Sequence, residues 1–165
     1  MRTDQVTPRI NFTQLLAYER PQAAAWVRGN AANPRLSGLV KFYQSTYGGV
    51  LVEAEIFGLP NIVTPGSSNF YAFHIHEYGN CSDNFSKVGG HYNPTDTSHP
   101  DHAGDMPPLL GNQGYAWSAF YDKRFTIDDI IGRSVIIHAD RDDFTSQPSG
   151  DPGPMIGCGE IRRVI

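Results

Sequence analysis

The chain has 165 residues, of which 39% are hydrophobic and 18% charged, as is usual for one folded globular domain. A net charge of −4 argues against nucleic-acid binding, which usually needs a basic face, and no apolar run is long enough to span a membrane. Seventeen glycines and twelve prolines indicate many turns and loops, and therefore an all-β fold.

The N-terminal residues predict a short helix packed on the rest of the domain. Residues 11–19 contain apolar side chains near helical spacing, and Asn11 is suited to cap them. We expect the helix to end before Pro21, within an N-terminal extension formed by residues 1–22. Residues 1–13 lack the apolar stretch of a secretory signal, which favours a cytoplasmic protein unless a leader is missing from this chain.

Beyond residue 22 the pattern changes to short strands, and residues 127–132 predict a turn or a short helical piece. The turn at residues 47–49 is expected to join two neighbouring strands in a hairpin. Roughly eight short strands with little helix indicate a β-barrel or β-sandwich over residues 23–165. The segments with strand character are 23–28, 36–43, 50–57, 70–76, 115–121, 134–138 and 157–165.

Two long segments, 77–113 and 140–154, interrupt these strands without any periodic apolar pattern. Loops of this length are uncommon in compact domains and are usually functional. Two lone cysteines are most often buried thiols, but Cys81 and Cys158 bracket the histidine-rich part of the chain, which favours a disulfide. Such a bridge would close a long loop and add on the order of 4 kcal/mol to the stability of the fold. It would also favour an oxidising compartment, which conflicts with the missing secretory signal.

The six histidines are the residues that most strongly indicate a function, because neutral imidazole is the usual nitrogen ligand of zinc and copper. Alternate side chains of a strand share a face, so His74 and His76 point the same way. His138 ends an apolar strand. Each residue has an ordinary alternative as a polar or surface side chain, but together they predict two adjacent metal sites. The first long loop adds His91, His99, His102 and Asp105, the last a suitable oxygen ligand for zinc.

These residues closely resemble the copper/zinc superoxide dismutases, from about residue 23 to residue 161. The resemblance implies an eight-stranded Greek-key β-barrel, an immunoglobulin-like sandwich with two long functional loops, here preceded by the short helical extension. It also implies an intrasubunit disulfide between Cys81 and Cys158. The segments that carry the resemblance are FHIHEYG at 73–79, GGHYNP at 89–94, HAGD at 102–105, GRSVIIH at 132–138 and CG at 158–159.

The resemblance assigns a role to each candidate ligand. The implied copper ligands are His74, His76, His91 and His138, and the implied zinc ligands are His91, His99, His102 and Asp105. His91 would bridge the two metals and act as a proton donor. Asp142 would accept hydrogen bonds from His74 and His99 and so orient both rings, although its ordinary alternative is a solvated loop acid.

The implied cofactors are therefore copper and zinc, and the implied substrate is the superoxide anion. Copper would cycle between Cu(II) and Cu(I) to convert superoxide to dioxygen and hydrogen peroxide, while zinc would be structural. The family includes dimers and monomers, so the resemblance allows a homodimer without deciding the oligomeric state. Its bacterial members are usually exported, which conflicts with the cytoplasmic interpretation of residues 1–13.

The chain departs from the family at the position that attracts the substrate. Most active members carry an arginine three residues before the second disulfide cysteine, and this chain has Met155 there. No lysine or arginine occurs from residue 143 to residue 160. The departure predicts slow turnover, because the rate for a small anion depends on a positive local field. Arg141 is a candidate substitute guide, with a solvated surface arginine as its alternative.

Two other functions remain open from the sequence. One is a non-catalytic, dismutase-like protein that binds zinc or copper, which Met155 favours. The other is a zinc hydrolase built on the two histidines of the 73–76 strand. The hydrolase is the weaker hypothesis, because it leaves His138 and the bridging role of His91 unexplained.

Overall fold

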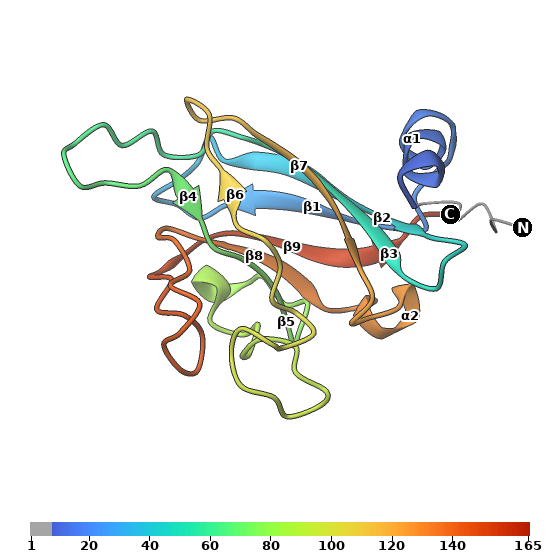
Figure 1. The fold of residues 1–165 in the computed structure, drawn as a ribbon. Coiled ribbons are helices and arrows are strands. Elements are labelled where there is room, and N and C mark those ends of the chain that lie inside the picture. Colours follow the sequence, from blue (N-terminus) through green and yellow to red (C-terminus); the bar gives the residue numbers. More distant parts are fainter. Residues whose placement is uncertain (1–7) are drawn as a thin grey trace, which may run out of the picture.

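The computed structural model describes residues 8–165, which form a curled antiparallel sheet with long loops at one side (Figure 1). The helices are α1 (Pro8–Tyr18), the single 3-10 turn η1 (Asp83–Phe85) and α2 (Ile127–Ile130). The strands are β1 (Ala23–Gly29), β2 (Ser37–Gln44), β3 (Val50–Phe57), β4 (Phe70–Tyr71), β5 (Phe73–His76), β6 (Leu109–Leu110), β7 (Ala116–Asp122), β8 (Ser134–His138) and β9 (Met155–Arg163).

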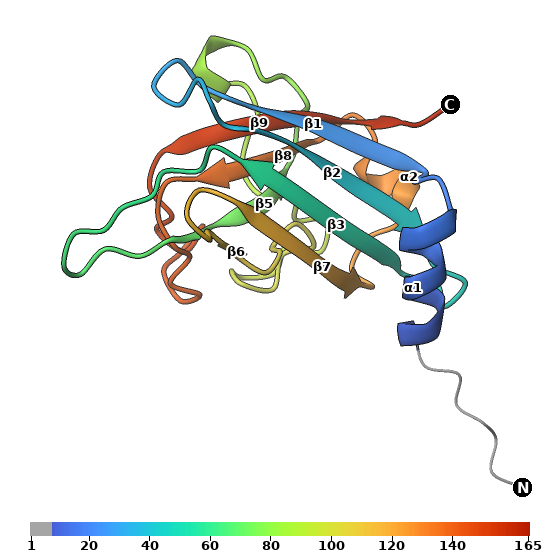
Figure 2. The ribbon, with the colours of Figure 1, turned by 90° about the horizontal axis from the view of Figure 1, so that it is seen from above.

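The seven-stranded sheet has the order β5-β8-β9-β1-β2-β3-β7, and every pairing is antiparallel. The chain leaves β3 near one edge, forms β5 at the opposite edge, returns to β7 beside β3 and then crosses again to β8 (Figure 2). These crossings give the predicted all-β Greek-key barrel. β4 and β6 pair separately as a short ribbon.

The core lies inside the curled sheet because residues alternate between its two faces. Val40 and Phe42 of β2 are fully buried, as are Val52, Ala54 and Ile56 of β3. The second helix is short, as predicted for residues 127–132, and it begins with a capping box between Thr126, just before the helix, and Asp129 within it.

Helix α1 covers part of the outer face of the sheet. Leu15 is buried against Tyr43 of β2 and Leu51 of β3, and the ring of Phe12 lies 5.3 Å from that of Tyr121. The prediction of a short helix packed on the domain is therefore confirmed. The predicted cap is wrong, because Asn11 lies inside α1, three residues after its first residue. The helix begins at Pro8, and the first position of a helix tolerates proline well.

Other differences concern strand limits. The predicted strand 70–76 is divided at Ala72, whose backbone N–H donates to Asp140 and whose carbonyl accepts from His138. The ribbon strand β6 was missed, because two leucines carry no periodic pattern. The last strand begins at Met155, two residues earlier than predicted, where the pairing of β8 with β9 shifts register.

Among the described residues, no helix is long and apolar enough to cross a membrane.

Candidate metal centre

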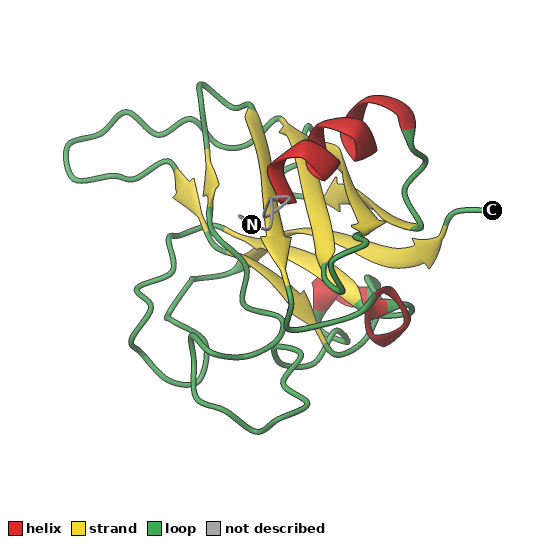
Figure 3. Cartoon of the chain, turned by 45° about the vertical axis from the view of Figure 1, so that its right-hand side comes forward, coloured by secondary structure: helices red, strands yellow, loops and turns green. Residues whose placement is uncertain are grey.

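The predicted ligands come together in two buried sets. The long loops that carry most of them lie together at one side of the sheet (Figure 3). Within each set, one donor atom per residue lies within 4.8 Å of all the others. His91 belongs to both. The first set is His74, His76, His91 and His138, and the second is His91, His99, His102 and Asp105.

The edge strand β5 places two of these histidines, and the first long loop buries them. Phe73 and Ile75 enter the core, so their neighbours face the opposite side. The loop then runs along the free edge of β5: the Ile75 N–H donates to Gly104 and its carbonyl accepts from Tyr92, each at 2.8 Å. Isolated bridges also join His74 to Asp105 and His76 to His91. The loop therefore takes the place of a partner strand.

Two rings of the first set, His76 and His138, turn unprotonated nitrogens toward each other. His76 Nδ1 lies 2.9 Å from the Gly89 carbonyl, and His138 Nδ1 lies 3.1 Å from that of Gly153. A carbonyl only accepts, so each Nδ1 carries the proton and each Nε2 presents a lone pair. These two Nε2 atoms are only 3.4 Å apart. Burial lowers the pKa of His138 to about 3 and that of His76 well below its usual value, so neither ring is cationic at neutral pH.

Asp142 connects the two sets. Its Oδ2 accepts a hydrogen bond from His74 Nε2 and its Oδ1 accepts one from His99 Nε2, both at 2.8 Å. In the neutral imidazole this arrangement leaves the lone pair on Nδ1, and the Nδ1 atoms of both rings are buried without a hydrogen-bond partner. His99 Nδ1 lies 3.0 Å from Asp105 Oδ2 without hydrogen-bond geometry, as expected for two donors of one metal.

His91 presents its two ring nitrogens differently. Its Nδ1 lies 2.7 Å from Asp105 Oδ1 and 3.3 Å from His102 Nδ1. Its Nε2 is buried without a partner, and it is the nitrogen left for the first set. Burial alone would raise the pKa of Asp105, but the hydrogen bond from His91 and the nearby histidines lower it to about 2. The residue is thus a carboxylate at neutral pH.

This chemistry fits two metal ions. Converging lone pairs and unpartnered buried nitrogens are costly without a cation between them. Four imidazoles suit copper, and three imidazoles with one carboxylate suit zinc in a tetrahedral site.

The two residues that the sequence analysis linked to anion attraction lie in different surroundings. Met155 is half-buried and packs against an apolar cluster that includes Val88 and Ile136. Arg141 is exposed, and no hydrogen bond or ion pair of its side chain is found within residues 8–165. The disulfide between Cys81 and Cys158 is present and ties the first long loop to β9.

Three residues at this centre were missed by the sequence analysis. Gln147 holds the backbone of His99, accepting from its N–H at 3.0 Å and donating to its carbonyl at 2.7 Å. Gly150 lies against the hydrogen-bonded side chains of Asp142 and His99 and leaves no room for a Cβ of its own. Arg124 donates to backbone carbonyls of the first long loop. None of the three belongs to a motif, so no pattern in the sequence indicated them.

A family model described as copper/zinc superoxide dismutase (SODC) matches residues 36–161. The chain belongs to the copper/zinc superoxide dismutase family. Together with the two histidine-rich donor sets, this membership supports the prediction of copper and zinc as cofactors.

Relatives agree with this assignment. An extracellular superoxide dismutase [Cu-Zn] of Oryctolagus cuniculus is 34% identical over 138 residues, which are 78% of this chain but only 56% of that longer protein. Superoxide dismutase [Cu-Zn] 3 of Arabidopsis thaliana is 33% identical over 147 residues, 79% of this chain and 85% of the relative.

Two solved structures are similar at 27% identity. The clock protein EA4 has a TM-score of 0.74 and covers 90% of this chain and 98% of its own. A double mutant of a SOD-like protein from Bacillus subtilis has a TM-score of 0.70 and covers 83% and 95%, respectively.

Proposed function

We propose that this chain is a superoxide dismutase with slow turnover. The observation that carries the proposal is the position of His91 between the two donor sets. Its Nδ1 contacts Asp105 of the second set, while its buried Nε2 has no hydrogen-bond partner and is left for the first. A residue shared in this way couples an electron-transfer site to a group that can hold a proton.

The ligands follow from the two sets. His74, His76, His91 and His138 would hold copper, and His91, His99, His102 and Asp105 would hold zinc. Bound copper would supply the one-electron chemistry that zinc cannot. One superoxide gives up an electron and leaves as dioxygen, and a second gains one electron and two protons and leaves as hydrogen peroxide.

The protein's own residues supply a proton and fix the geometry. Whenever it is not a copper ligand, His91 Nε2 would hold and deliver one of the two protons, with water supplying the other. The contacts of His91 Nδ1 with Asp105 and His102 keep the ring in place during this transfer. Asp142 orients His74 and His99 through their Nε2 atoms.

The proposed slow turnover rests on charge. Superoxide is a small anion, so its capture depends on the local positive field. Met155 cannot supply that charge, and the sequence from 143 to 160 holds no lysine or arginine. The exposed Arg141, beside Asp142, is the proposed substitute guide.

Two substitutions test the charge argument. Met155→Arg should raise kcat/KM for superoxide about tenfold at low salt, and the gain should shrink as ionic strength rises. Met155→Gln, which changes polarity without charge, is the matched control and should leave the rate near that of the wild type. An unchanged rate in Met155→Arg would refute the missing-charge argument. If Arg141→Ala leaves both the rate and its salt dependence intact, Arg141 is not the guide.

A second candidate is a non-catalytic, dismutase-like metal-binding protein. Met155 favours it, and so does the similarity to a structure named as a clock protein. Metal content after loading with copper and zinc, measured beside superoxide decay, separates the two candidates. Stoichiometric copper with no acceleration of superoxide decay would rule out the dismutase.

A further inference from the structure

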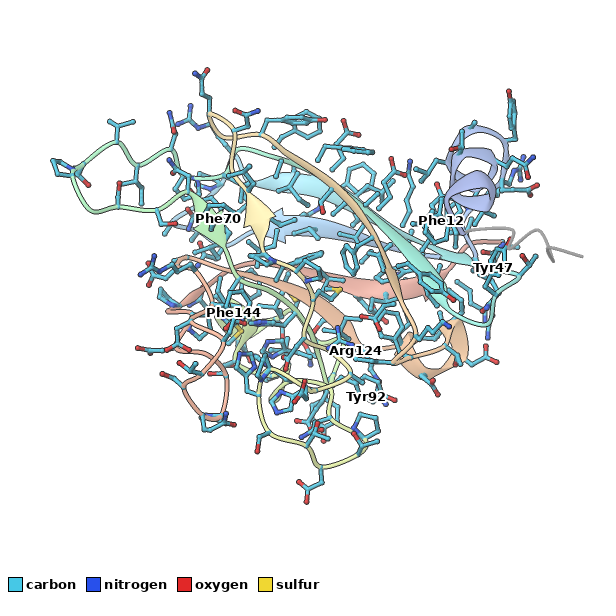
Figure 4. The ribbon with its side chains drawn as sticks, in the orientation of Figure 1. Phe12, Tyr47, Phe70, Tyr92, Arg124 and Phe144 are labelled. Atoms are coloured by element: carbon cyan, nitrogen blue, oxygen red, sulfur yellow. A yellow bond between two sulfur atoms is a disulfide. The ribbon has the colours of Figure 1, made fainter. Side chains whose placement is uncertain are left out.

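Arg124 lies two residues beyond the end of β7 and contacts the first long loop (Figure 4). Its Nη1 donates to the carbonyl of His102 at 3.0 Å, and its Nη2 donates to the carbonyl of Asp105. Its Nε donates to both carboxylate oxygens of Asp122, at 3.1 and 3.2 Å. One guanidinium therefore joins the barrel wall to two residues of the second donor set.

The barrel side of this contact is fixed. Asp122 pairs with Val50 across β3 and β7, and its side chain is only 4% exposed. The carboxylate also accepts the backbone N–H of Arg124 at 2.7 Å. Because the Asp122 carboxylate balances the Arg124 guanidinium, Arg124 lies next to the first long loop without adding net charge there.

The loop side of the contact is a tight turn. The Asp105 N–H donates to the His102 carbonyl at 3.1 Å, and the His102 N–H donates to Asp105 Oδ2 at 3.0 Å. The guanidinium thus binds the carbonyls at both ends of this turn. Within the turn, His102 Nδ1 and Asp105 Oδ2 are held 3.2 Å apart.

We propose that Arg124 is a positioning residue for the zinc ligands, setting the separation of His102 and Asp105 before the ion arrives. This inference rests on the proposed function, in which the second donor set holds zinc. The planar guanidinium is suited to the task because it offers donors in a fixed fork, whereas a lysine ammonium is a single point charge.

The test measures metal binding rather than dismutation. Arg124→Lys keeps the charge and removes the fork. Arg162→Lys is the matched control, because Arg162 is exposed and, among the described residues, its guanidinium pairs with Glu160 alone. Zinc affinity is measured on copper-loaded protein by competition with a chelator, and the visible spectrum of cobalt at the same site reports ligand geometry.

We expect Arg124→Lys to lower zinc affinity about 10- to 100-fold and to alter the cobalt spectrum, while Arg162→Lys changes neither. To separate misfolding from altered ligand geometry, the unfolding midpoint of each metal-free variant is recorded. Asp122→Asn, which removes the charge and one of the two acceptor oxygens that anchor the guanidinium, is measured alongside. Wild-type zinc affinity and cobalt spectrum in a folded variant of either kind overturn the inference. A wild-type protein that binds neither zinc nor cobalt overturns both this inference and the proposed function.

Discussion

Gly150 is the glycine at which we expect a single methyl group to damage the metal centre. A Cβ added there would lie 2.1 Å from Asp142 Oδ1 and 2.6 Å from His99 Nε2. The carboxylate would have to move by roughly 1 Å to reach even the tightest contact distance, and the 2.8 Å hydrogen bond between Asp142 and His99 would be lost. Gly150→Ala should therefore lower zinc affinity about 10- to 100-fold.

The backbone adds a second effect that needs its own control. The φ of Gly150 is +79°, in the left-handed region, where a side chain costs about 1–2 kcal/mol. Gly132 has the same φ, and nothing lies within 4 Å of a Cβ added to it. Both alanine variants should therefore carry the backbone cost in the metal-free form, measured by urea unfolding, and Gly150→Ala should lose additional stability because Asp142 is displaced. Only Gly150→Ala should lose zinc in chelator competition. Equal zinc affinity in the two variants would refute the reasoning.

Three further predictions concern stability and the link between the metal sets. Cys81→Ser should lower the unfolding free energy of the metal-free protein by about 4 kcal/mol, because the disulfide closes a loop with a sequence separation of 77; a urea titration with equal midpoints would contradict this. Burial, aided by Glu53, raises the pKa of Tyr43 to about 12 from 10.0, so its stabilising contribution is complete below pH 10 and is lost as pH rises towards 12. Tyr43→Phe should reduce this alkaline loss of unfolding temperature, and an unchanged pH profile would exclude Tyr43 as its source. Asp142→Asn can no longer accept from both histidines, so copper and zinc contents should fall together after dialysis, and loss of one metal alone would disprove the link.

The strands and the candidate ligands were predictable because they depend on side-chain patterns. The alternation of Phe73-His74-Ile75-His76 predicts one apolar and one imidazole face, and the structure places Phe73 and Ile75 in the core. The curled sheet follows from the same alternation in β1, β2 and β3.

Contacts made through backbone atoms were not predictable. Arg124 and Gln147 bind carbonyl and N–H groups, which every residue carries and which leave no mark in the sequence. Gly150 matters because of an atom that it lacks. The division of the 70–76 strand likewise depends on where Ala72 finds its backbone partners, 140 and 138, after the chain has folded.

The pairing of the first long loop with β5 also bears on self-association. Edge strands with free N–H and C=O groups are templates on which another chain can add, and aggregation often begins there. Here the two ends of the segment from Tyr92 to Gly104 hydrogen-bond to Ile75 at the outer edge of β5. His91 and Asp105, at the ends of that segment, are both candidate zinc ligands. A bound ion would fasten the segment over the edge, so zinc would serve solubility as well as the geometry of the centre.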